Sequence, residues 1–332
     1  MTRWRPGDVP GRLGRAGRAA APAVRVIVDN DFAGDPDDLF QLAHHLLLPS
    51  VDMRGVISSH LRPGDFFDPG PHSAAHGVER VERLAAAMRV DLEGVLLAGS
   101  EIGMADEVTS VSSAGVDRIV AEARAEGPPL FVVAGGGLTE VASALLAAPD
   151  IADRFTLVWI GGPEDPDLAE PPPGNPTPEY NLAIDVPAAR AVLASGVELW
   201  QVPRQTYRQC LVSTAELTAR LSGSGPLGEL LLAELGGLQD MIASHLGARH
   251  DTYVLGDQPL VLLTGLQTPF ESSPASSEFV RRPAPTIGDD GGFVWNPDGR
   301  EIRVWTRVDA RLIFEDMWLR FAALDEWAAA AG

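Results

Sequence analysis

Acidic side chains gather near the start of the chain, in the segment 24–48, VRVIVDNDFAGDPDDLFQLAHHLLL. Five carboxylates fall within it, at Asp29, Asp31, Asp35, Asp37 and Asp38. Carboxylates this crowded repel one another and keep a proton unless a cation lies among them, and hard oxygen ligands of this kind suit Ca²⁺ or Mg²⁺. The alternative is an acidic turn that only caps the following helix, but capping needs one acid. The segment therefore predicts a metal-centred active site.

The elements that must position these acids can be read around them. Residues 24–28 form a β-branched run broken only by Arg25, which predicts a strand. Apolar residues then recur at helical spacing through 39–46, and Pro49 ends the predicted helix. In open α/β sheets, ligands bind at the carboxyl ends of strands, which is where this acidic segment begins.

The same alternation of short apolar runs and helical stretches continues along the chain. Further predicted strands lie at 55–59, 95–98, 130–134, 156–160 and 198–202. This pattern predicts an α/β fold, with a mostly parallel open sheet flanked by helices on both faces.

The C-terminal third has a different pattern of predicted elements. Longer helical stretches, 225–248 and 309–330, are separated by a Pro-, Gly- and Ser-rich segment, 264–300, that predicts loops or a short hairpin. We expect a single domain over residues 23–332 with a helical C-terminal elaboration. A disordered leader rich in Arg, Gly, Ala and Pro is expected over residues 1–22.

Composition excludes several functions. The chain of 332 residues has a formal net charge of −20, which argues against nucleic acid as a partner because phosphate binding needs the opposite sign. It contains no uninterrupted apolar stretch of about 18 residues, so no transmembrane helix and no membrane partner are expected. Cys210 is the only cysteine, which excludes an internal disulfide and favours a reducing, cytoplasmic setting.

Two glycine turns follow later predicted strands. In Ala134-Gly-Gly-Gly-Leu-Thr-Glu-Val the glycines allow close backbone approach, so a carbonyl near Thr139 could face the acidic segment. The second turn follows Trp159, which could stack on a bound base or pack in the core.

Polar groups on two further segments could complete a site. The proline-pinned loop 174–181 presents Asn175, Glu179 and Asn181, which suit the hydroxyls of a sugar or form a solvated polar loop. Asp257 precedes an apolar helical run, where it is either an N-cap or a distant ligand for the cation of the acidic segment.

Taken together, these motifs resemble the calcium-dependent nucleoside hydrolases, the inosine-uridine preferring group. That family's first strand ends in Asp-x-Asp-Pro-Gly-x-Asp-Asp, and the corresponding segment here, 29–38, is two residues longer. Residues 134–141 look like its Gly-Gly-Leu-Thr-Asn turn with Glu140 for Asn, residues 158–162 like its Leu-Met-Gly-Gly, and residues 179–185 are similar to its Glu-Phe-Asn-x-x-x-Asp. With Asp257 as the late metal ligand, five motifs run in the family's order.

The resemblance implies a ligand set for Ca²⁺. It would consist of Asp31, Asp38, Asp257 and the backbone carbonyl of Thr139, and Asp31 would also take the proton from the attacking water. Asp29 would support these ligands from behind, and the additional Asp35 would either do the same or become an extra ligand.

The resemblance also implies a substrate site. Asp37, Glu179 and Asn181 would hydrogen-bond the ribose hydroxyls, with Asn175 as a helper and Trp159 against the base. The resemblance also implies a homo-oligomer, the usual state of members of this family. The expected function is hydrolysis of the N-glycosidic bond of a ribonucleoside or related small N-riboside.

The acid that protonates the leaving base is unassigned. The family often has His immediately before the late Asp, whereas this chain has Gly256. The remaining candidates are Tyr207, Tyr253, His60 and His250.

Two other functions stay open. One is a diverged ribose- or nucleoside-binding protein without hydrolase activity. The other is a Mg²⁺-dependent phosphohydrolase with Asp29 as nucleophile, which is less favoured because no Lys follows at a phosphate-binding turn.

Overall fold

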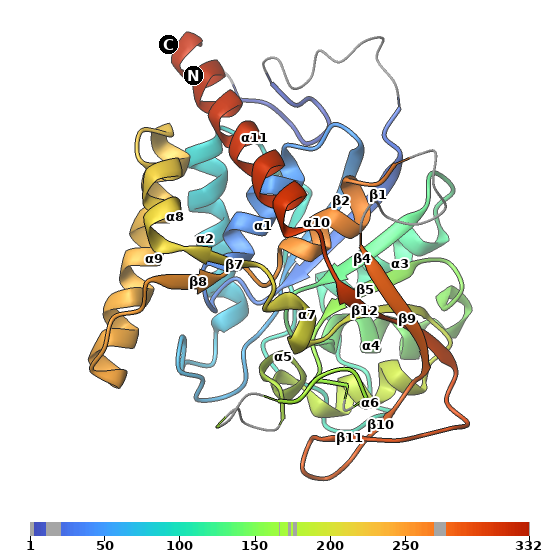
Figure 1. Cartoon of the computed structure of the whole chain (residues 1–332). Helices are drawn as coiled ribbons and strands as arrows, with labels where there is room; N and C mark the ends of the chain where they lie inside the picture. The colour runs from blue at the N-terminus through green and yellow to red at the C-terminus, as the bar shows by residue number, and fades with distance from the viewer. Residues whose placement is uncertain are drawn as a thin grey trace.

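The structure is a computed structural model that describes residues 3–10, 21–165, 167–171, 174, 178–268 and 277–331. Its centre is an eight-stranded sheet in the order β3-β2-β1-β4-β5-β6-β12-β9 (Figure 1). The strands are β1 (Val24–Asn30), β2 (Val51–Ser58), β3 (Leu96–Ala98), β4 (Leu130–Ala134), β5 (Thr156–Ile160), β6 (Glu198–Val202), β12 (Glu301–Arg307) and β9 (Glu278–Pro283). All neighbours pair in parallel except β9, which is antiparallel to β12. The mostly parallel open sheet expected from the sequence is confirmed.

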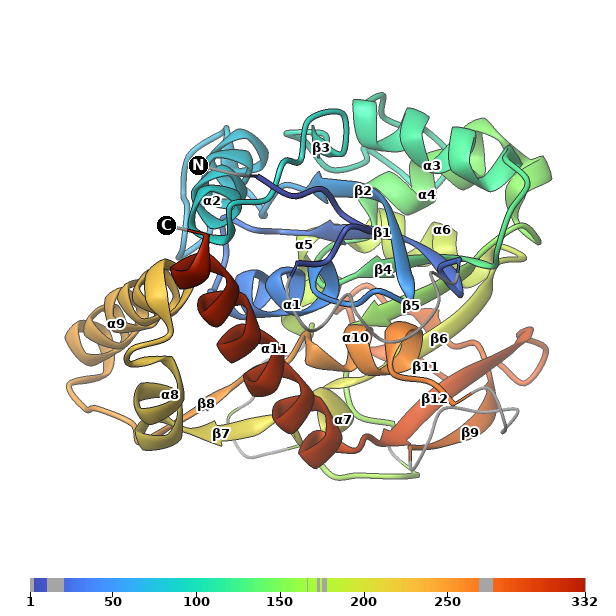
Figure 2. The same ribbon diagram turned by 90° about the horizontal axis from the view of Figure 1, so that it is seen from above.

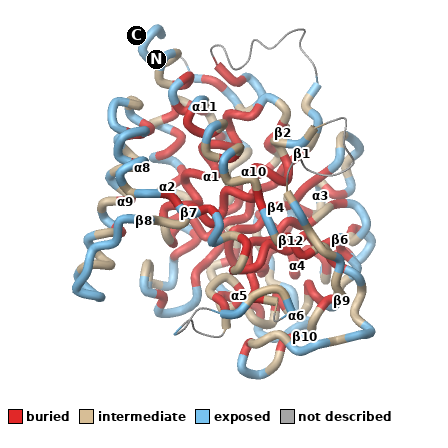
Figure 3. Tube along the Cα trace, viewed as in Figure 1, coloured by how far each residue is buried: buried red, intermediate tan, exposed pale blue. Residues whose placement is uncertain are grey.

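Strand β1 occupies the middle of the sheet because its β-branched residues are buried on both faces. Val26 and Val28 pack into the core on one face, whereas Ile27 packs into the core on the other, as the period of two in a strand requires. All three side chains have no exposed surface. Figure 3 shows this buried interior running through the middle of the molecule.

Helices cover both faces of the sheet (Figure 2). One side carries α3 (Ala114–Arg124), α4 (Thr139–Ala147) and α6 (Val186–Ala194). The other side carries α1 (Asp37–Leu46), α2 (Ser73–Met88) and α10 (Gln258–Gly265). Against these lie α9 (Gly225–Leu246) and α11 (Ala310–Ala330), and α8 (Thr214–Leu221) packs on α9. The predicted C-terminal helices therefore form, as α9 and α11.

Short elements complete the description. They are α5 (Tyr180–Ile184), α7 (Arg204–Tyr207), a 3₁₀ turn (Pro149–Ile151) and two small antiparallel pairs, β7 (Leu211–Ser213) with β8 (Thr252–Val254) and β10 (Thr286–Ile287) with β11 (Phe293–Val294). None of the helices in the described residues is long and apolar enough to cross a membrane.

The segment 264–300 departs from expectation. It contains the predicted hairpin, β10–β11, but it also supplies β9, which joins the main sheet. Pro283 closes β9, and a strand at the edge tolerates that proline because one side of its backbone needs no partner. The C-terminal elaboration therefore adds strands as well as helices; residues 269–276 lie outside the described part.

The N-terminal segment also differs from expectation. Residues 3–10 pack against the protein, because Trp4 is 5% exposed, its indole Nε1 donates to the carbonyl of Met88, and its backbone bridges to Val90. The prediction of a disordered leader is therefore wrong for residues 3–10. Residues 1–2 and 11–20 lie outside the described residues.

Candidate active site

The acidic segment lies where the sequence places it, in the turn between β1 and α1 at the carboxyl end of the central strand. Four of its five carboxylates and their distant partner Asp257 are almost withdrawn from solvent. Their exposed fractions are 0% for Asp29, 4% for Asp31, 9% for Asp37, 2% for Asp38 and 3% for Asp257, whereas Asp35 is half-buried. Burying this many carboxylates is costly unless each finds a donor or a cation.

Asn30 brings the near and far parts of the cluster together. Its side-chain Nδ2 donates to Oδ1 of Asp38 and to Oδ2 of Asp257, at 2.7 Å each. Its Oδ1 accepts from the backbone N–H of Gly135 at 2.9 Å, which fixes the direction of the amide. Sequence reasoning missed Asn30, although a polar residue ending a buried strand between two aspartates was a usable signal.

The glycine turn after β4 allows the close approach that the sequence suggested. A Cβ on Gly135 would lie 1.8 Å from Oδ2 of Asp257, and one on Gly136 would lie 3.0 Å from Cγ of Asp31. Any side chain at Gly135 would displace Asp257, so only glycine leaves room for the carboxylate.

The side-chain hydroxyl of Thr139 is held by two polar neighbours. Its hydroxyl donates to Oδ2 of Asp185 at 2.6 Å and lies 2.9 Å from Nε2 of His60. These contacts hold the first turn of α4 in place. The role of the Thr139 carbonyl as a ligand stays a prediction.

The electrostatics of the cluster fit a missing positive charge. Burial raises the pKa values of Asp31, Asp37 and Asp257 well above their ordinary range, and neighbouring carboxylates raise them further. Burial likewise raises the pKa of Asp38 to about 6. Oδ2 of Asp31 is buried without a hydrogen-bond partner, which is the state that a bound cation would relieve.

The donor set suits a hard divalent ion, but the side chains are not closed around one. Asp38 lies within hydrogen-bonding reach of both Asp31 and Asp257. Even so, the described residues include no set of three or more Asp, Glu, His or Cys side chains already arranged as a metal cage. Asn30 contacts one oxygen of Asp38 and one of Asp257, and each carboxylate has a second oxygen that an ion could use.

A cavity of about 230 Å³ opens onto the acids. Its acidic wall consists of Asp31, Asp35, Asp37, Asp257 and Glu179, and its other residues include Asn181, Gly135, Gly256, Ile160, Phe67, Tyr180 and Tyr207. This volume is below that of drug-sized pockets and is suited to a sugar-sized ligand.

Two predicted sugar-binding residues face this cavity from α5. Glu179 accepts hydrogen bonds from the backbone N–H groups of Gly162 and Leu182, at 2.8 and 3.1 Å, and from the Tyr207 hydroxyl at 2.9 Å. Burial raises the pKa of the Glu179 carboxyl. Asn181 donates to the carbonyls of Gly135 and Ile160, which joins the ends of β4 and β5. Among the described residues none donates to the side-chain oxygen of Asn181, which stays available to a ligand.

Other predicted residues do not reach the cavity. Trp159 is fully buried in the core, where its Nε1 donates to the carbonyl of Gly136, so packing rather than stacking on a base describes its place. Asp29 is sealed behind the cluster beside Ser59, and burial, together with Glu140, raises its pKa. Asn175 lies outside the described residues.

The candidates for the leaving-group acid are separated by position. Tyr207 lines the cavity, whereas the Tyr253 hydroxyl accepts from the backbone N–H of Asp37 at 3.1 Å. His60 is buried between the Leu61 carbonyl and Thr139, and His250 is exposed. Gly256 stands at the cavity wall without a side chain to donate a proton.

Arg80 was not expected at the site from the sequence. From helix α2 its Nη1 donates to the carbonyls of Phe32 and Gly34, at 2.7 and 2.6 Å, inside the β1–α1 turn. An irregular turn makes few hydrogen bonds within its own backbone, so Arg80 supplies the donors that these two carbonyls need. No local signal in the sequence links Arg80 to this turn.

The fold and the acid-lined cavity define a class, the N-glycosyl hydrolases of the nucleoside hydrolase type. The family model described as inosine-uridine preferring nucleoside hydrolase matches residues 73–264. The chain belongs to this family, and the match begins after the acidic segment, the part in which the spacing is altered.

Solved structures share the fold at low sequence identity. A plant nucleoside hydrolase, PpNRh1, has a TM-score of 0.67 and 18% identity, covering 91% of this chain and 100% of its own. A purine-preferring ribonucleoside hydrolase from Gardnerella vaginalis has a TM-score of 0.68 and 16% identity, covering 91% and 99%. The type III effector XopQ, solved with adenosine diphosphate ribose, has a TM-score of 0.55 and 18% identity, covering 96% of each chain. No curated protein matches the chain.

Proposed function

We propose that this protein hydrolyses the N-glycosidic bond of a ribonucleoside or a related small N-riboside, with Ca²⁺ as cofactor. One observation carries the proposal: buried carboxylates from the β1–α1 turn and from α10 meet Glu179 and Asn181 around a single sugar-sized cavity. Family membership supports it, and the solved ribonucleoside hydrolases share the fold.

The residues that would hold the ion are Asp31, Asp38, Asp257 and the Thr139 carbonyl. When bound, the ion would neutralise the buried carboxylates and lower the pKa of the attacking water. Oδ2 of Asp31, which no described residue hydrogen-bonds, would take the proton from that water.

The sugar would be oriented by the remaining polar groups. Asp37, Glu179 and Asn181 would bind ribose hydroxyls, with Asn175 a further proposed contact. Cleavage passes through an oxocarbenium-like state at the anomeric carbon, which the nearby carboxylates stabilise electrostatically. Asp35 lines the cavity and adds to that negative field.

A diverged riboside-binding protein without hydrolase activity is the second candidate. Two observations favour it: the absent side chain at Gly256, where the family often supplies an acid, and the Asn30 amide between two of the proposed ligands. A phosphohydrolase using Asp29 is disfavoured, because that carboxylate is sealed from the cavity.

The proposal also covers the location, the oligomeric state and the partners of the protein. We expect a cytoplasmic homo-oligomer that acts on a free small molecule and has no nucleic-acid or membrane partner. The net charge of −20 supports the exclusion of nucleic acid.

The test is ribose release from a panel of purine and pyrimidine nucleosides, with Ca²⁺ added or chelated. Calcium-dependent release that is lost in Asp31→Asn supports the hydrolase. Ribose binding by calorimetry without release from any nucleoside would instead establish the binding protein. Release that is unchanged after chelation and dialysis would exclude the metal-dependent mechanism.

A further inference from the structure

The contact between helices α1 and α10 is polar although it is buried. His45, in the last turn of α1, is 1% exposed, and its Nε2 lies 2.8 Å from Oγ1 of Thr264 on α10. The neighbouring His44 reaches Gln258 of the same helix at 2.9 Å. Because buried polar groups need partners, these contacts constrain how α1 and α10 lie against each other.

His45 ends a series of hydrogen bonds that begins at the acidic cluster. Nδ2 of Asn30, which donates to Asp38 and Asp257, also lies 3.2 Å from Oε1 of Gln41. Nε2 of Gln41 contacts Nδ1 of His45 one turn later in α1. We call Asn30, Gln41, His45 and Thr264 the polar series. Its first three members are at most 1% exposed, so water does not take the place of these bonds.

The donors of the polar series all point toward α10. The hydroxyl of Thr264 gives its only hydrogen to the Leu260 carbonyl at 2.7 Å, so its oxygen can only accept from His45. Nε2 of His45 therefore carries a hydrogen. Burial lowers the pKa of His45 to about 3, so the ring is neutral at pH 7 and its Nδ1 accepts from Gln41. The oxygen of the Gln41 amide then faces Asn30.

This direction determines which oxygens of two carboxylates are left for an ion. The Gly135 N–H holds one end of the Asn30 amide, and Gln41 contacts the other end. Rotating the amide would turn its oxygen toward three other oxygens. In the orientation observed, Nδ2 takes Oδ1 of Asp38 and Oδ2 of Asp257, which leaves the second oxygen of each carboxylate.

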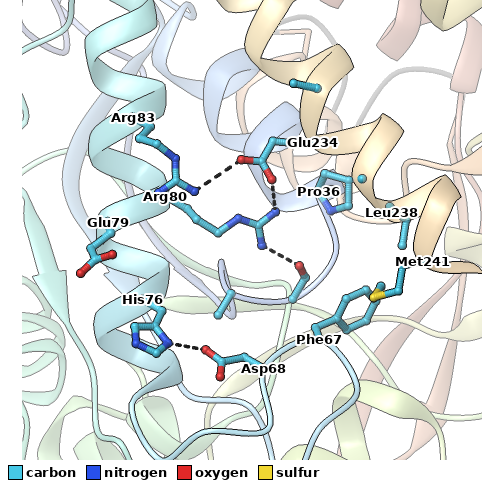
Figure 4. A pocket seen from close by; sticks show the side chains of 14 residues that line it. Pro36, Phe67, Asp68, His76, Glu79, Arg80, Arg83, Glu234, Leu238 and Met241 are labelled. Atoms are coloured by element: carbon cyan, nitrogen blue, oxygen red, sulfur yellow. Dashed lines mark hydrogen bonds and ion pairs between the residues drawn. The ribbon is translucent and has the colours of Figure 1, made fainter.

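The polar series also links two elements that the β1–α1 turn does not join by itself. The turn is held from another side by Arg80, which reaches from α2 (Figure 4) and donates to the carbonyls of Phe32 and Gly34. Asp257 lies outside the turn, directly before α10. Its distance from Asp38 therefore depends on how α1 and α10 are held together.

We propose that Gln41 and His45 are positioning residues for the cation. His45 fixes the orientation of Gln41, and Gln41 holds the Asn30 amide. That amide sets which oxygens of Asp38 and Asp257 face the ion. Neither Gln41 nor His45 lines the acidic cavity. The inference rests on the proposed metal-dependent hydrolysis and extends it to residues that touch neither ion nor substrate.

The first test is Ca²⁺ affinity, measured by calorimetry without substrate. Gln41→Met keeps the length of the side chain and removes both of its hydrogen bonds, so the Kd for Ca²⁺ should rise about ten-fold. Gln201→Met is the matched control, because Gln201 is 2% exposed and donates to the Gly161 carbonyl at 3.0 Å. It should bind Ca²⁺ as the wild type does. An unchanged Kd in Gln41→Met, or an equal rise in both variants, overturns the inference.

A combined variant tests whether Gln41 acts through Asn30. In the Asn30→Ala background, Gln41→Met should weaken Ca²⁺ binding no further, because the amide that Gln41 holds is absent. Losses that add would overturn the inference, since Gln41 would then act by another route.

The tautomer of His45 tests the direction of the bonds without a substitution in the protein that is measured. In ¹⁵N NMR spectra of the wild-type protein labelled at histidine, His45 is assigned through the signal that is missing from His45→Gln. Its hydrogen should be on Nε2 at pH 7. A hydrogen on Nδ1, or on both nitrogens, overturns the inference even if Gln41→Met does not fold.

These measurements need no nucleoside, so the inference and the proposed function can fail separately. If no nucleoside is hydrolysed but the Kd for Ca²⁺ rises only in Gln41→Met, the positioning role is supported although the hydrolase has failed. If ribose release depends on Ca²⁺ and the Kd is unchanged in Gln41→Met, the inference alone is overturned. A wild-type protein that binds no Ca²⁺ overturns the inference together with the proposed cofactor.

Discussion

Nδ2 of Asn30 lies 2.7 Å from a carboxylate oxygen of Asp257, although the two residues are 227 positions apart in the chain. This bond joins the turn after the first strand to the start of α10. It also gives a neutral donor to a cluster of acids that would otherwise repel one another. The first prediction follows from it.

Replacing Asn30 by Ala removes the donor shared by Asp38 and Asp257. Leaving buried carboxylates without a hydrogen bond should lower the free energy of unfolding of the metal-free protein by about 1–3 kcal/mol. Chemical denaturation in the presence of chelator measures this value. The aspartate variant Asn30→Asp should be less stable still in chelator and should recover with Ca²⁺; equal stability of all three proteins would contradict the role assigned to Asn30.

The pH dependence of stability has a definite sign. The folded-state pKa of Asp38 is raised to about 6, and those of Asp31, Asp37 and Asp257 are raised as well. The folded state then binds more protons than the unfolded chain, so the metal-free protein should lose stability as pH rises from about 4 through 6. Urea denaturation at pH 5 and pH 7 tests this, and greater stability at pH 7 in chelator would refute it.

Calcium should reverse that loss at neutral pH. A ligand that binds only the folded protein stabilises it by about 2.7 kcal/mol at a hundred times its Kd, so the melting temperature should rise by several degrees. Asp257→Asn should abolish the rise. Asp117→Asn, at an exposed position in α3, is the matched control and should leave it unchanged. A rise of the same size in all three proteins would place the ion elsewhere.

Glu179 and Tyr207 should have separable roles. Glu179→Gln removes the buried charge proposed to bind a ribose hydroxyl and should lower kcat/KM by about 10²-fold. Tyr207→Phe removes only one of the three donors that hold Glu179, so its effect should be about ten-fold or less and the same for every leaving group. A loss confined to purine nucleosides, with a nitrophenyl riboside spared, would instead make Tyr207 the leaving-group acid.

Arg80 should stabilise the lengthened turn. Arg80→Met removes two hydrogen bonds to backbone carbonyls and an ion pair, so stability should fall by about 2–3 kcal/mol. Arg83 is a matched control on the same helix, because it pairs with the same glutamate, at 3.5 Å, and makes no bond to the turn. Arg83→Met should cost about 0.5 kcal/mol or less, and equal losses would show that the ion pair alone matters.

The sequence predicted the sheet and the acidic turn because both depend on local patterns. The β-branched run of β1 and the helical spacing after Asp38 specify their own conformations. The pairing of Asn30 with Asp257 and of Arg80 with Gly34 depends on tertiary packing between distant segments, for which one sequence carries no signal. Strand β9 was missed for a related reason: its Arg-rich, Pro-terminated segment has low strand propensity and pairs only because β12 is beside it.

Asp257 is intermediate between the features that local patterns predict and those that depend on tertiary packing. Its position before a helix is compatible with ordinary capping, and the sequence left that alternative open beside a role as a distant metal ligand. In the structure its side chain makes no cap, and its carboxylate accepts from Asn30 instead. Trp159 shows the converse, since the end of a strand beside a glycine turn suggested contact with a ligand, whereas its burial assigns it to the core.

The two edge strands of the main sheet, β3 and β9, are poorly suited to pairing with a strand from another molecule. At one margin β3 spans only three residues, and at the other β9 terminates in proline and carries charged side chains, among them Arg281 paired with Glu301. Neither margin is a good template for a strand from another molecule. Fibrillar or edge-to-edge association is thereby discouraged, and any ordered assembly of copies is expected to use helices and loops rather than an extended intermolecular sheet.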